Sequence, residues 1–377
     1  MQFSPLSIRN FTCETPIVQG GMGVGVSLAR LAGAVAREGG LGTLSGACLD
    51  RLVSRRMERK IATREAAATE VAEAKACGGR IAINVMVALE ATYEDSVLGA
   101  MDGGVDAVVS GAGLPLRLPS VVKSHPRAHE VALLPIVSSA RAFRLICQRW
   151  QKAGRLPDAA VLEGPMAGGH LGWKTPAEIH DPANALEILL PEVLKVAEEF
   201  GRIPVIAAGG VFTHGDVRRM LAMGASGVQM GTRFLATMES SASVAYKRAV
   251  VECDQEGILV TQDPGSPCGL PFRVLKSSPM YSQTVAGVRK ARCDKGYVLF
   301  NGKCAAQDSP DRYFCICNGL LSSAGYNPEE EAPLYTVGAN AHRVDRILSV
   351  PELMAELRGA LGASSGQEEP VATAAAA

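Results

Sequence analysis

Residues 204–234 read PVIAAGGVFTHGDVRRMLAMGASGVQMGTRF, and this stretch decides the fold class. Two short apolar runs, Pro204–Ala208 and Gly227–Met230, each end in small residues. Between them, Thr213–Met223 has apolar residues near helical spacing and is followed by Gly224, as helices often are. The stretch therefore predicts a strand, a glycine turn, a helix, a second strand and a second glycine turn.

The two turns, Gly209-Gly210 and Gly231-Thr232, have the composition of a phosphate-binding site. Because glycine has no side chain, backbone N–H groups there can approach an anion closely. Helix N-termini beside such turns favour negative charge. We call these turns the phosphate turns and expect one phosphate group to bind across both.

The same alternation of apolar run and helix extends back to the N-terminus. The six earlier strands are expected at Pro16–Val18, Leu41–Leu44, Arg80–Val85, Asp106–Val109, Leu133–Val137 and Ala159–Leu162. Helices are expected at Ser27–Arg37 with Ser27 as N-cap, Thr63–Cys77, Tyr93–Met101, Leu118–Lys123, Ser139–Lys152, Ala185–Phe200 and Ser241–Cys253. Eight such units in about 250 residues match an α/β fold of the (β/α)₈ TIM barrel type. A doubly wound open sheet is the alternative, and the number of repeats favours the barrel.

The repeating pattern ends after Cys253. Residues 254–362 are rich in Gly, Pro, Ser and Cys, so we expect an irregular C-terminal appendage packed on a barrel of residues 1–253. Val350–Leu361 is expected as a helix within it. Residues 363–377 have low complexity and are expected to be a disordered tail.

Five cysteines distinguish the appendage, namely Cys268, Cys293, Cys304, Cys315 and Cys317. Four thiolates can bind zinc or an iron–sulfur cluster. Their spacing lacks the paired C-x₂-C segments that identify such sites, so we expect reduced thiols and no metal. Their role stays open.

Charge and hydropathy exclude several classes of function. The chain of 377 residues has 38 basic and 38 acidic residues and is 47% hydrophobic. Without a basic excess, nothing indicates a nucleic-acid partner or an anionic membrane surface. No signal-peptide pattern and no membrane-spanning apolar run is present, so we expect a cytoplasmic protein that binds small molecules. Its oligomeric state stays open, a homo-oligomer included.

Small and polar residues gather at the carboxyl ends of the expected strands, where barrels of this class bind their ligands. These residues are Gln19–Met22, Asn84, Ser110–Gly113, Ser138-Ser139, Glu163, His170 and the phosphate turns. Each is a weak signal alone, because glycine pairs are commonly plain turns. Their shared location predicts a single site.

Six segments in this order resemble the nitronate monooxygenase family, also called 2-nitropropane dioxygenase, which includes flavin-dependent enoyl-[acyl-carrier-protein] reductases. They are QGGM (19–22), INVM (83–86), SGAG (110–113), AGGH (167–170), AAGG (207–210) and MGTRF (230–234). The resemblance runs from about Pro16 to Tyr246 and does not cover the region beyond Cys253.

The resemblance implies a barrel that holds FMN. Its phosphate would lie on Gly209, Gly210, Gly231 and Thr232. Gly21, Met22 and Asn84 would line the isoalloxazine ring, with Gly168 and Gly169 near its reactive side. An amide such as Asn84 suits the polar edge of a flavin, since it both donates and accepts hydrogen bonds. Glu163 would hold a flavin or ribose group, orient His170 or cap neighbouring amides.

His170 is the candidate for proton transfer. It follows two glycines in a loop, and the pKa of histidine lies near working pH. In the family that this sequence resembles, the matching histidine is the acid or base beside the flavin. A surface or capping histidine is the alternative interpretation.

Three functions fit these residues. The first is a nitronate monooxygenase, which uses O₂ to convert an alkyl nitronate into a carbonyl compound and nitrite, with His170 as base or hydrogen-bond donor. The second is an NAD(P)H-dependent reductase of enoyl thioesters, with His170 as proton donor. The third is a non-catalytic barrel that binds a phosphate ligand.

Overall fold

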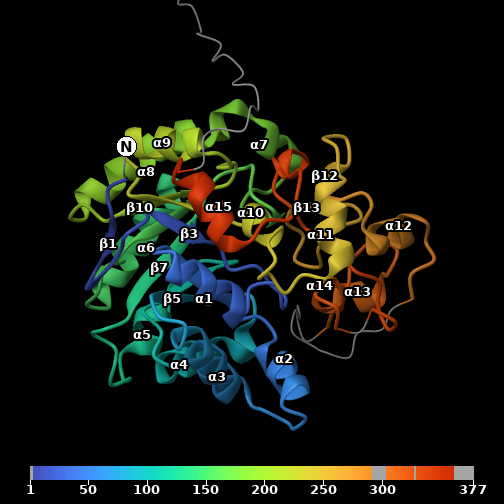
Figure 1. Cartoon of the computed structure of the whole chain (residues 1–377), viewed down its shortest axis with the longest axis horizontal. Helices are drawn as coiled ribbons and strands as arrows, with labels where there is room; N and C mark the ends of the chain where they lie inside the picture. The colour runs from blue at the N-terminus through green and yellow to red at the C-terminus, as the bar shows by residue number, and fades with distance from the viewer. Residues whose placement is uncertain (1–2, 291–302, 327, 361–377) are drawn as a thin grey trace, which may run out of the picture.

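Eight parallel strands form a closed barrel in the computed structural model, which describes residues 3–290, 303–326 and 328–360 (Figure 1). The strands, in chain order, are β3 (Ile17–Gln19), β4 (Leu41–Ser45), β5 (Arg80–Met86), β6 (Ala107–Gly111), β7 (Ala132–Val137), β8 (Ala160–Glu163), β10 (Val205–Ala208) and β11 (Gly227–Met230). Strand β10 pairs in parallel with both β8 and β11, which closes the ring. The predicted TIM barrel is therefore confirmed, and an open sheet is excluded.

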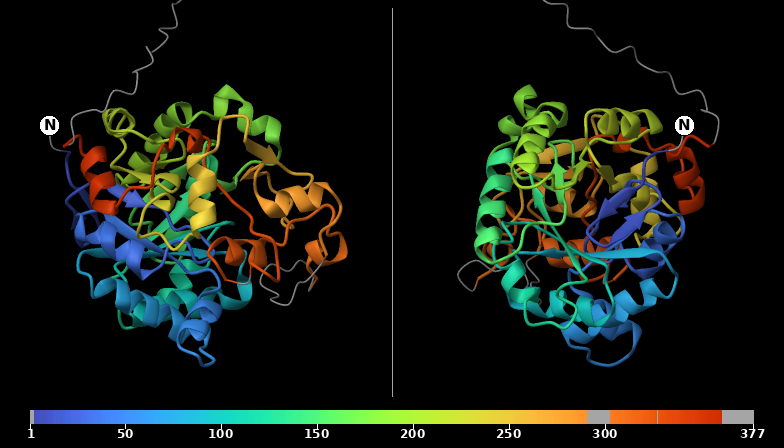
Figure 2. Two further views of the ribbon diagram at one scale, coloured as in Figure 1. Left: turned by 45° about the vertical axis from the view of Figure 1, so that its right-hand side comes forward. Right: turned by 90° about the vertical axis from the view of Figure 1, so that its left-hand side faces the viewer.

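Helices cover the outside of the barrel between successive strands (Figure 2). They are α1 (Ala29–Arg37), α2 (Leu49–Arg56), α3 (Thr63–Lys75), α4 (Glu90–Asp102), α5 (Leu118–Val122), α6 (Ala140–Lys152), α8 (Leu186–Glu199), α9 (His214–Ala222) and α11 (Val244–Val251). Thr213 and Asp216 form a capping box at the start of α9, which satisfies N–H groups that a helix end leaves without partners.

The predicted N-cap at Ser27 is wrong. Helix α1 begins at Ala29, and its N-cap residue Leu28 has no side-chain cap. The hydroxyl oxygen of Ser27 instead accepts a hydrogen bond from the amide of Met22 at 2.9 Å. The N–H of Ala29 donates to the carboxylate of Glu70 at 2.7 Å, so a neighbouring helix satisfies the start of α1. Ser27 therefore closes the loop after β3.

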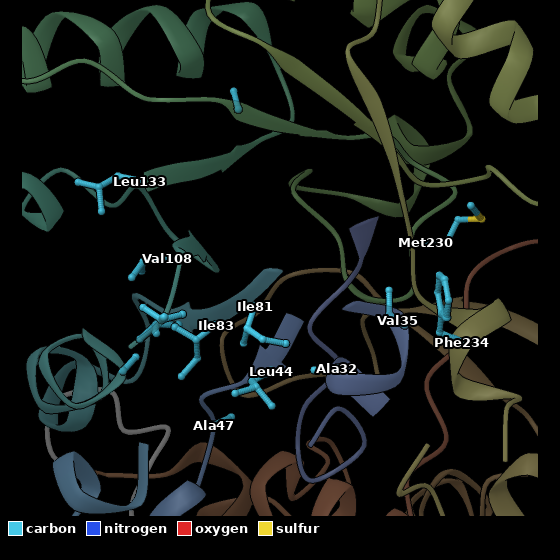
Figure 3. Packing of buried hydrophobic residues seen from close by; sticks show 14 of the residues in the cluster. Ala32, Val35, Leu44, Ala47, Ile81, Ile83, Val108, Leu133, Met230 and Phe234 are labelled. Carbon is cyan, nitrogen blue, oxygen red and sulfur yellow. The ribbon is translucent and has the colours of Figure 1, made fainter. Parts of the chain in front are cut away.

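Two hydrophobic layers hold the barrel together. Residues such as Leu44, Ile81, Ile83, Val108 and Leu133 fill the space between strands and helices (Figure 3). A second cluster fills the barrel interior with side chains that include Val18, Leu41, Ala82, Val109, Leu134, Val161 and Ile206. Close packing of such layers supplies most of the stability of a domain of this size.

A hairpin of β1 (Leu6–Ile8) and β2 (Phe11–Cys13) packs on one end of this interior. Arg9 in its turn donates hydrogen bonds to the carbonyl of His129 and the carboxylate of Asp158, which precede β7 and β8. The hairpin thus covers the amino end of the strands, and the carboxyl end remains for a site.

The chain after α11 adds short elements beside the barrel rather than a second regular fold. Strands β12 (Ile258–Thr261) and β13 (Phe272–Leu275) form an antiparallel sheet with β9 (Gly169–His170), which belongs to the loop after β8. The elements α12 (Pro279–Val285), α13 (Ala305–Asp308) and α14 (Ile316–Ser323) lie to one side, in orange in Figure 1. Helix α15 (Val350–Leu357) contacts α1, α9 and the short α10 (Thr232–Leu235). The domain boundary near residue 253 stays a prediction, and the predicted tail at 363–377 lies outside the described residues.

Candidate active site

A cavity of about 590 Å³ lies at the carboxyl ends of the barrel strands. The catalytic candidate His170 lines it, and so do all the predicted cofactor-binding residues, namely Gly21, Met22, Asn84, Glu163, Gly168, Gly169, Gly209, Gly210, Gly231 and Thr232. Strand ends that lie far apart in the sequence meet here because parallel strands share one carboxyl edge. The cavity brings these residues together, while the role given to each remains a prediction.

Glycine is required by the backbone at Gly209. Its φ of +87° lies in the left-handed region, and a Cβ atom there would stand 2.7 Å from the carbonyl oxygen of Gly164. A Cβ on Gly21 would stand 2.4 Å from the Cβ of Asn84, so that glycine lets the loop after β3 pass close to β5. Close packing of neighbouring protein atoms therefore demands glycine at both positions, and both glycines line the cavity.

The C-terminal segment braces both phosphate turns. The hydroxyl oxygen of Thr232 accepts a hydrogen bond from the amide of Gly338 at 2.9 Å. The side-chain amide of Asn340 donates to the carbonyl oxygen of Gly210 at 2.7 Å. Residues beyond the barrel strands therefore fix the geometry of the turns.

His170 is held on strand β9 by the C-terminal sheet. Its Cα pairs with that of Phe272 on β13, and the two rings meet edge to face with centroids 4.6 Å apart. Nε2 of the imidazole lies 2.6 Å from the hydroxyl oxygen of Ser266. The backbone pairing and this hydrogen bond fix the position of the ring beside the cavity.

The sequence does not single out Ser266, and Cys268 was expected only as one of five reduced thiols whose role stayed open. Both residues lie in the loop between β12 and β13, and both line the cavity. The Ser266 hydroxyl lies 3.1 Å from the sulfur of Cys268, which is exposed. Neither periodicity nor a motif marks this Gly/Pro-rich loop, so the only signal was a cysteine among glycines and prolines.

Partial burial of the Cys268 thiol disfavours its charged form and by itself would raise its pKa. Hydrogen bonding and proximity to His170 act in the opposite direction, as do hydrogen bonds from Ser266 and the Leu270 backbone. These interactions outweigh the burial and lower the pKa of Cys268 to about 7. Glu163 shows the opposite shift, because burial raises the pKa of its carboxyl group to about 7. The Glu163 carboxyl group is thus harder to ionise than an ordinary glutamate, and the Cys268 thiol is easier to ionise than an ordinary cysteine. Both groups face the same cavity.

Polar groups without protein partners also face the cavity. The carboxyl group of Glu163 and the amide group of Asn84 make no hydrogen bond within the part of the chain that the structure describes. The buried Oε1 of Gln229 has no partner there either. Buried polar groups are normally satisfied, so these groups fit a ligand rich in donors and acceptors, such as a flavin and its ribityl chain.

Residues 3–290, 303–326 and 328–360 contain no group of three or more His, Cys, Asp or Glu side chains arranged to hold a metal ion. Cys304, Cys315 and Cys317 are buried, while Cys293 lies outside the described residues. In the same part of the chain, no helix has the length and apolar character needed to cross a membrane.

Known proteins resemble this chain over most of its length. The profile of the nitronate monooxygenase family matches residues 4–359. A Mycobacterium tuberculosis protein named (3aS,4S,5R,7aS)-5-hydroxy-7a-methyl-1-oxo-octahydro-1H-indene-4-carboxyl-CoA dehydrogenase is 32% identical over 70% of this chain, a match that spans 64% of that protein. A probable nitronate monooxygenase of Bacillus subtilis is 27% identical over 67% of this chain and 75% of its own.

Two solved structures share the architecture. FabK from Thermotoga maritima superposes with a TM-score of 0.65 at 24% identity and covers 93% of this chain and 92% of its own, which shows the fold alone. Nitroalkane oxidase from Streptomyces ansochromogenes superposes with a TM-score of 0.64 at 25% identity and covers 91% of this chain and 94% of its own. These relatives are oxidoreductases, and members of the family depend on a flavin. By the match over residues 4–359, the chain belongs to the nitronate monooxygenase family.

Proposed function

We propose that the protein is an FMN-dependent nitronate monooxygenase that uses O₂ to convert an alkyl nitronate into a carbonyl compound and nitrite. One observation carries this proposal beyond family membership. His170 lines the same cavity as both phosphate turns, so the candidate acid–base group and the candidate anion-binding turns face one space.

The residues around the cavity divide the work of binding FMN. Gly209, Gly210, Gly231 and Thr232 would bind its phosphate through backbone N–H groups and a hydroxyl. Gln229 offers a buried carbonyl oxygen that has no partner among the described residues, and Asn84 and Glu163 offer further polar groups on the cavity wall. Gly21 and Met22 would contact the ring, and a thioether suits a polarizable surface. Bound FMN supplies the electron transfer from substrate to O₂.

His170 would act on the nitro compound itself. Its imidazole would take the proton from the carbon next to the nitro group of a neutral nitroalkane, or donate a hydrogen bond to an oxygen of a nitronate that arrives ionised. Ser266, 2.6 Å from Nε2, would fix the ring orientation and so the atom that carries the proton. Acid–base catalysis of this kind contributes about 10²–10⁴ to a rate.

A second candidate is an NAD(P)H-dependent reductase of enoyl thioesters. It is favoured by the M. tuberculosis relative, whose name places a coenzyme A thioester in its substrate. In this reaction His170 would donate a proton to the carbon next to the thioester carbonyl. Both chemistries need the same flavin and the same histidine, so the substrate must be tested directly.

The deciding experiment is anaerobic mixing of the purified protein with each reductant while the flavin absorbance is followed. Under the monooxygenase proposal, propyl-2-nitronate reduces the flavin and NAD(P)H does not. Rapid bleaching by NAD(P)H, with reoxidation by an enoyl thioester, would establish the reductase instead. A protein that neither contains FMN nor takes it up would overturn both.

His170→Gln tests the acid–base assignment, with His180→Gln as the matched control because His180 is an exposed residue at the end of α7 (Pro176–His180). We expect the His170 variant to keep FMN and to lose at least about 10²-fold in kcat/KM for neutral nitroalkanes. Full activity in that variant would remove His170 from the mechanism.

A further inference from the structure

Three groups with exchangeable protons form a chain from the cavity to the surface. His170 Nε2 lies 2.6 Å from the hydroxyl oxygen of Ser266, and that oxygen lies 3.1 Å from the sulfur of Cys268. All three residues line the 590 Å³ cavity. The proposed function uses His170 and Ser266, but it leaves the thiol without a task.

The thiol is accessible, whereas the hydroxyl that links it to the histidine is not. Ser266 is only 1% exposed, so its hydroxyl has a fixed place between imidazole and sulfur. Cys268 is exposed at the edge of the cavity. The sulfur therefore lies on the wall of the same cavity as the imidazole and the phosphate turns, at a residue that solvent reaches.

Other thiols of the chain provide a contrast. Burial raises the pKa of Cys13 and of Cys147 to about 12, and burial with Asp254 nearby raises the pKa of Cys253 to about 11. At Cys268 the neighbouring imidazole and hydroxyl overcome the effect of burial and bring the pKa to about 7. The thiolate is the reacting form of cysteine. Cys268 is therefore both exposed and the thiol among these four that ionises most readily.

We propose that Cys268 is a covalent modification site, at which α,β-unsaturated carbonyl compounds that enter the cavity add to a thiol activated by His170 through Ser266. The sulfur forms a bond to the β-carbon of the acceptor, and the C=C π bond breaks. The thiol proton passes to His170 or to solvent, and the α-carbon gains a proton from the same source. No oxidant or reductant is needed, because the net change is the addition of S–H across a double bond.

This site goes beyond the proposed function, since it needs neither FMN nor a nitronate. An adduct on Cys268 would lie in the cavity close to His170 and take up space that the substrate needs. Soft electrophiles of this class would thus inactivate the enzyme stoichiometrically, and saturated carbonyl compounds of the same shape would not.

The test is N-ethylmaleimide labelling of the purified full-length protein, with peptide mass spectrometry to follow each cysteine and N-ethylsuccinimide as the unreactive control compound. At pH 7 about half of a thiol with pKa near 7 is ionised, and the lower intrinsic nucleophilicity of such a thiolate offsets part of that gain. We expect Cys268 to react at least about fivefold faster than Cys253, with a rate that rises through an inflection near pH 7. Cys268→Ser should abolish the fast phase.

His170→Gln and Ser266→Ala test the activation separately from accessibility. Either change should move the inflection toward the ordinary cysteine pKa of about 8.5 and slow labelling at pH 7 severalfold. The proposal is overturned if Cys268 labels no faster than Cys253, or if its pH profile is unchanged in both variants. Labelling does not depend on turnover. Slow labelling of Cys268 would therefore leave the proposed function intact, and a protein without monooxygenase activity would leave the Cys268 proposal intact.

Discussion

The guanidinium group of Arg233 lies 2.7 Å from the carboxylate of Glu356, which joins the turn after the last barrel strand to helix α15. The Arg233 side chain is only 10% exposed, and its guanidinium also lies over the ring of Phe212, 4.4 Å from the centroid. Burial lowers the pKa of Arg233, and Glu356 opposes that shift. The guanidinium group of Arg233 is therefore held by an ion pair and by an aromatic ring.

Glu356→Gln should therefore destabilise the protein by about 1–3 kcal/mol, because it leaves a largely buried guanidinium without its carboxylate. The matched control is Glu198→Gln, which breaks a pair with Arg202, a side chain 82% exposed. Exposed pairs contribute about 0–1 kcal/mol. Urea unfolding of the two variants measures the difference, and equal effects would contradict the prediction.

Gly209→Ala should abolish FMN binding. Alanine would have to adopt a φ of +87°, with its Cβ 2.7 Å from the carbonyl oxygen of Gly164, so the first phosphate turn would have to move. Backbone strain of this kind costs about 1–3 kcal/mol.

The control is Gly215→Ala within α9, where a Cβ would lie 3.6 Å from the Thr213 hydroxyl oxygen and the backbone is ordinary. Alanine in a helix is more favourable than glycine by about 0.5–1 kcal/mol. Flavin content after gel filtration and the thermal midpoint report both effects. Retention of FMN by the Gly209 variant would show that this turn does not bind the phosphate.

Glu163 should make the FMN-free protein less stable as pH rises. Burial raises the pKa of Glu163 to about 7, above the 4.5 of an unperturbed glutamate, so the folded state binds the proton more tightly than the unfolded state does. The folding contribution is fully present below about pH 4.5 and is lost as pH rises through 7.

Glu163→Gln should remove this dependence of stability on pH. The difference in thermal midpoint between the variant and the wild type should therefore be more positive at pH 8 than at pH 5. Glu192→Gln, an exposed change on α8, controls for the loss of a negative charge. Differential scanning calorimetry of FMN-free samples from pH 5 to 8 supplies the midpoints. Parallel curves for the wild type and the Glu163 variant would refute the assignment.

Arg273 on β13 holds the loop that carries His170. It is 4% exposed and donates hydrogen bonds to the carbonyl oxygens of Pro165, at 2.9 Å, and Ala167. Burial lowers its pKa to about 10, so the guanidinium stays charged at neutral pH. Hydrogen bonds from charged groups contribute about 1.5–3 kcal/mol each.

Arg273→Met should therefore lower the stability by about 2–3 kcal/mol and reduce kcat, since two carbonyl groups lose their donor and the loop is released. Arg312→Met is the control, because Arg312 is an exposed arginine of the same C-terminal segment that pairs with Asp263. Chemical unfolding and steady-state kinetics separate the two effects. Unchanged kcat in the Arg273 variant would mean that the loop keeps its position without it.

The barrel could be predicted because local sequence signals, namely glycines, helix caps and apolar runs, mark where its strands and helices begin and end. Strands β10 and β11 lie between glycines and a well-capped helix, and their observed limits, Val205–Ala208 and Gly227–Met230, agree with the apolar runs. Burial on both faces makes such strands continuous apolar runs, which are visible in the sequence. The cavity followed from the same geometry, since parallel strands place their carboxyl ends together.

The C-terminal half of the site could not be predicted, because tertiary pairing creates it. Ser266 approaches His170 only when β13 pairs with β9, a contact between residues 96 positions apart. No local pattern encodes that pairing. Ser27 shows the same limit on a smaller scale. Its hydroxyl oxygen accepts a hydrogen bond from the amide of Met22 in the preceding loop instead of capping helix α1.

The antiparallel pairing of β9 with β13 has a consequence for how this enzyme can diversify. The histidine belongs to the barrel, but the surface opposite it is built from a hairpin whose loop, between Thr261 and Phe272, takes no part in closing the ring. We expect insertions or exchanges in that loop to alter what reaches the imidazole and to leave the phosphate turns in place. Under the proposed function, substrate range and cofactor retention could then change separately.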